Sequence, residues 1–347
     1  MTKEIITKTQ SNLTVGGLSI DFQRTCRVPS GIINSLPAGL GSFPLYKVAD
    51  FKSGVPSDWN AESYFFPMYK SEAMWMSFSR NYKDPTALIV AAGNINAISG
   101  KPFDLTKETI NGEVLRMPAG LDIKLEDQNY LVVPPQPWLD GWKAEDGKVY
   151  QFVAAEMGSG ETVEGQITGE EKVGGIQFIT YKPKEGLKLV PQTRPREHII
   201  GGDYDYCIEE MLCFGGSKEA LYRSAIADCS VQSMGLGKGG EIDQKIYSDP
   251  YGLDVWSQSH CGAARIYIVS SADFKQITGR AAPPTPVTYE KYQSLGMPWF
   301  ELYDEKYKDT KGSSVFDKLK PVSGGPTLVE KIYEKPKVEV SSFKIFE

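Results

Sequence analysis

Apolar and polar residues alternate with a period of two over several short segments of the chain. Leu18, Ile20 and Phe22 are separated by polar residues, which predicts a strand with one buried face. The continuous apolar run 86–92 predicts a strand buried on both faces. Similar short segments predict further strands over 74–78, 130–133, 149–157, 175–181, 264–269 and 299–303.

Helical periodicity is scarce, and glycine and proline turn signals separate most of the apolar segments. The best helical segment begins after Ser217, which is suited to be its N-cap. A second, shorter helix is predicted over 287–292, with Thr288 as its N-cap. The pattern therefore predicts a mainly β protein. We expect a β-sandwich or jelly-roll-like domain over 12–185, a linker over 186–201, and a smaller β-rich α+β region with closing strands over 202–347.

The segment 134–142 combines three prolines, two tryptophans and a glycine. Proline fixes φ and removes backbone donors, so this segment is predicted to be a rigid corner and not a helix or a central strand. Asp140 and Gly141 suit a turn. Trp138 and Trp142 are expected to anchor packing. The alternative is a binding platform for carbohydrate formed by Trp138, Asp140 and Trp142.

Composition narrows the classes of partner. The 347 residues are 41% hydrophobic and 24% charged, with a formal net charge of −6, which is typical of a soluble globular protein and argues against nucleic acid as a partner. The apolar run 87–92 is too short for a transmembrane segment, and the start of the chain does not resemble a secretory signal. Five scattered cysteines without a C-x-x-C pair indicate reduced thiols and a cytoplasmic protein.

Two further segments are candidates for ligand or metal binding. Gly237, Lys238 and Gly239 belong to a glycine-rich stretch that suits an anion-binding nest, although a connector or close backbone packing explains it as well. Asp203 and Asp205 lie on one side of an extended segment and suit a hard cation, with a solvated acidic edge strand as the alternative. We expect no cofactor.

Catalytic patterns are few. The chain has two histidines, and His260 and Cys261 would face opposite sides of a strand, so they form no nucleophile–base pair. A carboxylate pair for glycan hydrolysis remains open. The acids nearest the proline-rich corner are the first candidates, namely Asp140, Glu156, Glu161 and Glu164.

Several motifs together carry a family resemblance. They are 22–25 (FQRT), 27–29 (RVP), 67–69 (PMY), 72–75 (EAMW), 134–141, 151–153 (QFV), 162–170 (TVEGQITGE), 234–240, 246–247, 249–254 (DPYGLD) and 296–300 (GMPWF). They resemble an uncharacterised family of microbial and fungal β-rich proteins, whose members are often labelled integral membrane proteins. In some members the C-terminal part is joined to a ubiquitin-like domain. The resemblance covers roughly 18–305 and implies no activity and no catalytic residue.

These observations favour a non-enzymatic protein whose role is binding or self-assembly, with itself as partner in a homo-oligomer or higher assembly. The first alternative is a carboxylate-dependent hydrolase acting on glycans. The second is a membrane-inserting, pore-forming β protein, although the cleanly alternating runs are shorter than the ~9–11 residues of a membrane-spanning strand.

Overall fold

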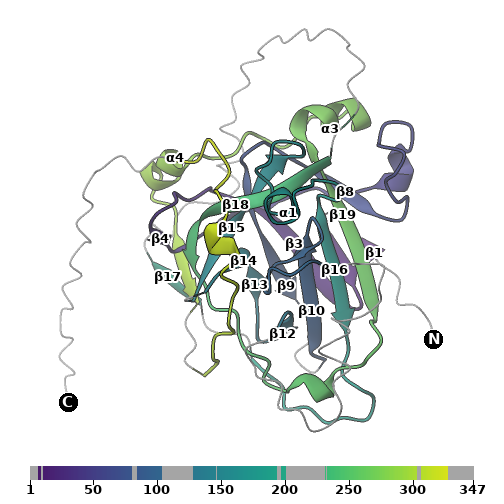
Figure 1. The fold of residues 1–347 in the computed structure, drawn as a ribbon, viewed down its shortest axis with the longest axis vertical. Coiled ribbons are helices and arrows are strands. Elements are labelled where there is room, and N and C mark those ends of the chain that lie inside the picture. Colours follow the sequence, from purple (N-terminus) through teal and green to yellow (C-terminus); the bar gives the residue numbers. More distant parts are fainter. Residues whose placement is uncertain are drawn as a thin grey trace, which may run out of the picture.

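The computed structural model describes residues 7–8, 11–79, 84–103, 128–145, 147–193, 197–200, 231, 233–302 and 306–326. The protein is mainly β, as predicted, and most of the described strands belong to one curled sheet (Figure 1). This sheet contains β1 (Thr7–Lys8), β2 (Asn12–Val15), β3 (Leu18–Thr25), β4 (Ile33–Asn34), β6 (Gly39–Ser42), β7 (Tyr46–Lys47), β8 (Tyr64–Met68), β9 (Ala73–Ser79), β10 (Thr86–Ala92), β11 (Ile95–Asn96), β12 (Leu131–Val133), β13 (Trp138–Leu139), β14 (Gly141–Lys143), β15 (Lys148–Glu156), β16 (Ile176–Tyr181), β18 (Ser233–Asp243) and β19 (Gly262–Ser270).

A second, three-stranded sheet and a few short helices complete the described fold. The small sheet contains β5 (Leu36–Pro37), β17 (Glu197–Ile200) and β20 (Trp299–Leu302). The helices are α1 (Val163–Thr168), α3 (Ser271–Thr278) and α4 (Tyr289–Ser294), with the 3₁₀ turns η1 (Val48–Phe51), η3 (Leu253–Val255) and η4 (Phe316–Lys318). No helix in the described residues is long and apolar enough to cross a membrane.

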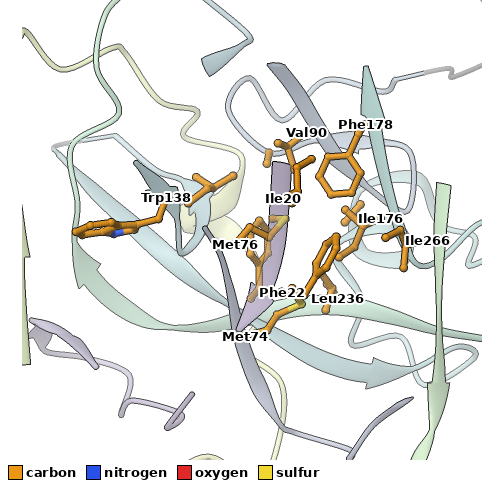
Figure 2. Packing of buried hydrophobic residues seen from close by; sticks show 14 of the residues in the cluster. Ile20, Phe22, Met74, Met76, Val90, Trp138, Ile176, Phe178, Leu236 and Ile266 are labelled. Atoms are coloured by element: carbon orange, nitrogen blue, oxygen red, sulfur yellow. The ribbon is translucent and has the colours of Figure 1, made fainter. Parts of the chain in front are cut away.

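The large sheet contains a long antiparallel succession of strands, and the twist between neighbouring strands curls it. β3 pairs with β9, β9 with β15, β15 with β18, β18 with β19, β19 with β16, and β16 with β10. β3, at one end of this succession, faces β16, next to its other end, across the main core. Phe22 of β3 and Phe178 of β16 lie with ring centroids 5.9 Å apart, and Figure 2 shows them among the packed side chains.

The hydrophobic pattern explains how the strands lie in this core. β3 alternates between buried and half-buried residues, as its period of two predicts. β10 is buried along its whole length, and its two faces contact two different clusters. Leu88 and Val90 belong to the main cluster, whereas Ile89 packs with Tyr181 and Trp256 in a second one. The predicted two-sided burial of 86–92 is confirmed.

The division of the chain at 186–201 does not separate two groups of strands. β18 and β19 come from the predicted second region, yet they pair with β15, β16 and β8 from the first. Strand pairing joins residues far apart in the sequence. A proline-rich stretch between two strands does not indicate whether those strands pair. β18 and β19 therefore belong to the same large sheet as most strands before 186–201, whereas β17, within that stretch, and β20 pair in the small sheet with β5.

The proline-rich corner is built differently from the prediction at Asp140 and Gly141. These residues are not a turn: Gly141 begins β14 and pairs with Gln151. A side chain at Gly141 would overlap the backbone carbonyl of Tyr150, so glycine is needed there for close approach and not for a positive φ. The predicted helix after Ser217 lies outside the described residues.

The short helix near 287–292 is confirmed as α4, and the Thr288 side chain accepts a hydrogen bond from the Lys291 N–H at its start. The sequence prediction missed α1 and α3, although Thr162 and Ser270 cap them in the same way. Helices of six and eight residues carry too few turns to show a helical period.

Removal of a core side chain tests the packing between the two ends of the sheet. We expect Ile20→Ala, at a fully buried position, to lower the free energy of unfolding by about 2–5 kcal/mol. Ile33→Ala is the matched control because Ile33 is 65% exposed, and its effect should stay within about 0.5 kcal/mol. Urea denaturation measures both, and equal effects would contradict this description of the core.

Candidate functional site

A cleft of about 450 Å³ lies where the end of β3 meets the β8–β9 connection, the segment that leads into α4, and residues 324–326. Its lining contains both charges, two tyrosines and two prolines. The residues are Thr25, Arg27, Tyr69, Lys70, Ser71, Glu72, Ala73, Pro286, Val287, Thr288, Tyr289, Glu290, Gly324, Gly325 and Pro326. Segments distant in sequence thus meet at one concave surface.

One side of this cleft rests on a buried ion pair. Nε and Nη2 of Arg24 lie 2.7 Å from Oε1 of Glu72, and Oε2 of Glu72 accepts a hydrogen bond from the Tyr69 N–H at 2.8 Å. Burial raises the pKa of Glu72, and Arg24 and the Tyr69 N–H oppose this rise. Both carboxylate oxygens are occupied, so Glu72 serves as support.

The same ion pair holds the opposite wall. Nη2 of Arg24 donates to the carbonyl of Pro284, and the Tyr69 hydroxyl donates to the carbonyl of Pro283 at 2.9 Å. These bonds tie the segment before α4 to β3 and to the β8–β9 connection. Tyr289, at the start of α4, packs edge-on against Trp299. The two walls are therefore held in place on both sides of the opening.

Arg27 is a cleft cation that has no carboxylate in direct contact among the described residues. It is 9% exposed, and its Nη1 and Nη2 atoms donate to the carbonyls of Ser323 and Val322. Its Nε has no hydrogen-bond partner, and the described residues give it no salt bridge. Burial lowers the pKa of Arg27 to about 10, with Glu161 opposing. A buried cation without a contacting anion is costly.

The remaining groups near Arg27 do not neutralise it by contact. Lys70 pairs with Glu156 at 3.0 Å, and both side chains are about half exposed. Glu290 lies exposed in the first turn of α4. Burial, with a smaller effect of Glu290, raises the pKa of Cys26 to about 12, so this thiol stays protonated near neutral pH and is a poor nucleophile.

The tryptophans proposed as a binding platform lie outside this cleft. Trp138 is 4% exposed and packs near Trp75. Trp142 is fully buried against Phe152 and Phe316, and its Nε1 donates to the carbonyl of Gly237 at 3.1 Å. Both rings contact other parts of the chain, which is the architectural role that the sequence also predicted.

Asp140 is buried without normal hydrogen bonds. Its side chain is fully buried, and neither carboxylate oxygen has a hydrogen-bond partner in the described residues. Burial raises the pKa of Asp140 well above its ordinary value, and the Trp138 side chain offsets this only in part. Burial therefore favours the protonated, uncharged form of this carboxyl group, because a buried charge is costly.

The glycine-rich stretch is part of β18 and not a loop. A side chain at Gly237 would overlap Val322, and one at Gly239 would lie 2.6 Å from Val153, so these glycines permit close packing. Lys238 between them is 7% exposed. Its Nζ donates to the carbonyls of Phe316 and Asp317 at 3.0 and 3.2 Å and lies 3.7 Å from the Tyr150 ring centroid. Burial lowers the pKa of Lys238.

The other predicted acids are used in local structure. Glu156 pairs with Lys70, Glu161 accepts the Ser323 N–H at 3.0 Å, and Glu164 accepts backbone N–H groups of the segment 172–174. Asp203 and Asp205 lie outside the described residues. Within the part that the structure describes, no group of three His, Cys, Asp or Glu residues is placed to hold a metal.

The sequence interpretation missed Arg27 and Glu72 as site residues, although both lie in motifs that it singled out. A signal was present: Arg24 and Arg27 flank Cys26 at the end of an alternating strand, where charged residues need partners if they are buried. The fold and the cleft define a β-rich protein with a charged, aromatic-walled cleft. Comparisons with protein-family models, curated proteins and solved structures give no match for the chain.

Loss of the buried carboxylate tests the support of the cleft. We expect Glu72→Gln to lower the free energy of unfolding by about 3–5 kcal/mol, because it leaves Arg24 buried without its anion. Glu62→Gln is the control: Glu62 pairs with Lys47 at 3.0 Å but is 77% exposed, so the loss should be below about 1 kcal/mol. If urea denaturation gives similar losses in the free energy of unfolding for both variants, burial does not make the Arg24–Glu72 pair more important for stability than an exposed pair.

Asp140→Asn tests the protonated state of the buried acid. In the wild type, stability should fall as pH rises above the unfolded-state pKa of about 3.9, because the folded state holds a proton that the unfolded state has released. The side-chain amide of the variant has no such proton. The free energy of unfolding of the variant relative to the wild type should therefore rise by up to about 1.4 kcal/mol per pH unit. Unfolding at pH 5 and 7, with Asp58→Asn as an exposed control, measures this gain. Parallel pH profiles of Asp140→Asn and the wild type would refute it.

Proposed function

We propose that the protein is a non-enzymatic binding protein whose cleft takes a small organic anion at Arg27. The observation that carries the proposal is the guanidinium itself: it is largely buried, it lines the cleft, and the described residues offer it no salt bridge. A carboxylate or phosphate oxygen placed against the guanidinium from the cleft would supply a contacting negative charge. Such charge-assisted bonds are among the stronger hydrogen bonds in proteins.

The shape of the cleft supports a ligand with a flat or apolar body. A volume of about 450 Å³ lies within the range of roughly 300–1,000 Å³ that is usual for small-molecule sites. Tyr69 and Tyr289, with Pro286 and Pro326, provide ring surfaces on its walls. Because Arg24 and Glu72 already satisfy one another, Arg27 is the group that selects an anion.

The chemistry of the lining favours binding over hydrolysis. Glycan hydrolysis needs two carboxyl groups about 5–9.5 Å apart that are available to a substrate. Both oxygens of Glu72 are engaged, which leaves Glu290 as the available carboxylate in the lining. The Cys26 thiol is held in its protonated form. Self-association and membrane insertion stay predictions from the sequence, which light scattering and liposome leakage test.

Titration calorimetry with phenyl phosphate, benzoate and the uncharged benzamide tests this proposal. We expect the two anions to bind and benzamide to bind at least tenfold more weakly. Arg27→Met should weaken anion binding by about 30-fold or more, equivalent to about 2 kcal/mol. Arg280→Met, at an exposed arginine outside the cleft, is the matched control and should leave the affinity unchanged.

A second variant guards against misfolding, since Arg27 also contacts residues 322 and 323. Glu290→Gln removes an exposed negative charge from the cleft, and we expect it to raise anion affinity a few-fold. Equal binding of benzoate and benzamide, or wild-type anion affinity in a folded Arg27→Met protein, would contradict the proposed function.

A further inference from the structure

Residues 316–326 form a segment, here called the strap, that lies along β18 and ends at the cleft (drawn in yellow in Figure 1). Two apolar side chains anchor it. Phe316 is fully buried against Trp142, and Val322 is buried in a cluster with Ala73, Val153 and Ala155. The Val322 N–H donates to the carbonyl of Lys238 at 2.8 Å, so the strap continues the sheet hydrogen bonding locally.

Side chains of the sheet and of α1 fix the strap along its length. Lys238 binds the carbonyls of Phe316 and Asp317, and the Tyr150 hydroxyl donates to Oδ1 of Asp317 at 2.6 Å. Gln166 makes two bonds with Lys320: its Nε2 donates to the carbonyl at 3.0 Å, and its Oε1 accepts from the N–H at 2.7 Å. Gln166 is not among the residues that line the cleft.

Arg27 holds the end of the strap, and the strap in turn reaches over its guanidinium. After the two carbonyls that Arg27 binds, Gly324 and Gly325 line the cleft. A side chain at Gly325 would lie 2.9 Å from Nη2 of Arg27, so the backbone is in close approach to the cation. Gly324 has a φ of +70°, a conformation that favours glycine.

The backbone of the strap thus forms one wall of the cleft, with Gly325 next to the guanidinium of Arg27. Neither the Gly324 N–H nor the Gly325 N–H donates a hydrogen bond to a described residue.

We infer that the strap is part of the anion site: it lines the cleft with residues 324–326 and its carbonyls at 322 and 323 position the Arg27 guanidinium, so oxyanion binding and strap docking are thermodynamically linked. The inference rests on the proposed function and names how that site is regulated. Linkage is reciprocal: a bound anion must stabilise the docked strap by as much as docking strengthens anion binding.

Hydrogen exchange of the full chain, with and without phenyl phosphate, tests the linkage. Exchange in peptides covering 316–326 should slow as ligand is added, by a factor of up to about 100 at a ligand concentration 100 times Kd. Peptides covering 84–103, which do not line the cleft, should not change. Benzamide should slow nothing, since it lacks the negative charge.

Gln166→Ala separates strap docking from ligand contact. It removes the two bonds to Lys320, so exchange of the strap without ligand should be about fivefold faster, and phenyl phosphate should still slow it. Gln258→Ala, at an exposed glutamine with no side-chain hydrogen bond to the described residues, is the matched control and should leave exchange of the strap as in the wild type.

The outcomes distinguish the two proposals. If calorimetry shows binding of phenyl phosphate while exchange of 316–326 stays unchanged, the linkage is wrong and the proposed function stands. If neither phenyl phosphate nor benzoate binds, the proposed function fails and the linkage fails with it. Slower exchange confined to the strap and cleft peptides supports both.

Discussion

The close approach of other segments to β18 is the constraint on which the rest of the structure depends. Glycines along β18 let backbone and side chains come nearer than a Cβ would allow: Gly235 against Thr162, Gly237 against Val322, and Gly239 against Val153 of β15. β18 also lies at the middle of the antiparallel succession and joins its two halves through β15 and β19. The same strand thus closes the core on one side and receives the strap on the other.

The position of the strap is linked to the positions of two buried cations. The strap presents backbone carbonyls to two cations, Lys238 at its start and Arg27 at its end, and the Glu161 carboxylate accepts its Ser323 N–H. Lys238 also lies against the Tyr150 ring and near Asp317. Glu161 is the acid whose charge acts on Arg27, and Arg27 is the one of these two cations that borders the open volume of the cleft. Anion binding is therefore proposed at Arg27.

Local pattern predicted much of this fold. The alternation in β3, the apolar run of β10 and the Thr288 cap of α4 each depend on residues close in sequence, so the sequence alone reveals them. Gly141 was misinterpreted, and Gly237 was left open between an anion nest and close packing, because a glycine looks the same in each of these roles and only the tertiary partner decides. Likewise Arg24 and Glu72 are 48 positions apart, and nothing local shows that they meet. The cleft, made from four separate segments, was beyond prediction for the same reason.

The fold does not itself require a cation at position 27. Buried charges usually cost stability, and an apolar residue of similar size is often as good or better. Val322 and Phe316 already anchor the strap through apolar contacts, and Lys238 binds its carbonyls. A neutral donor would satisfy the Val322 and Ser323 carbonyls without the cost of burying a charge. The guanidinium at the cleft is thus better explained by an anion that it receives than by the packing that it supports.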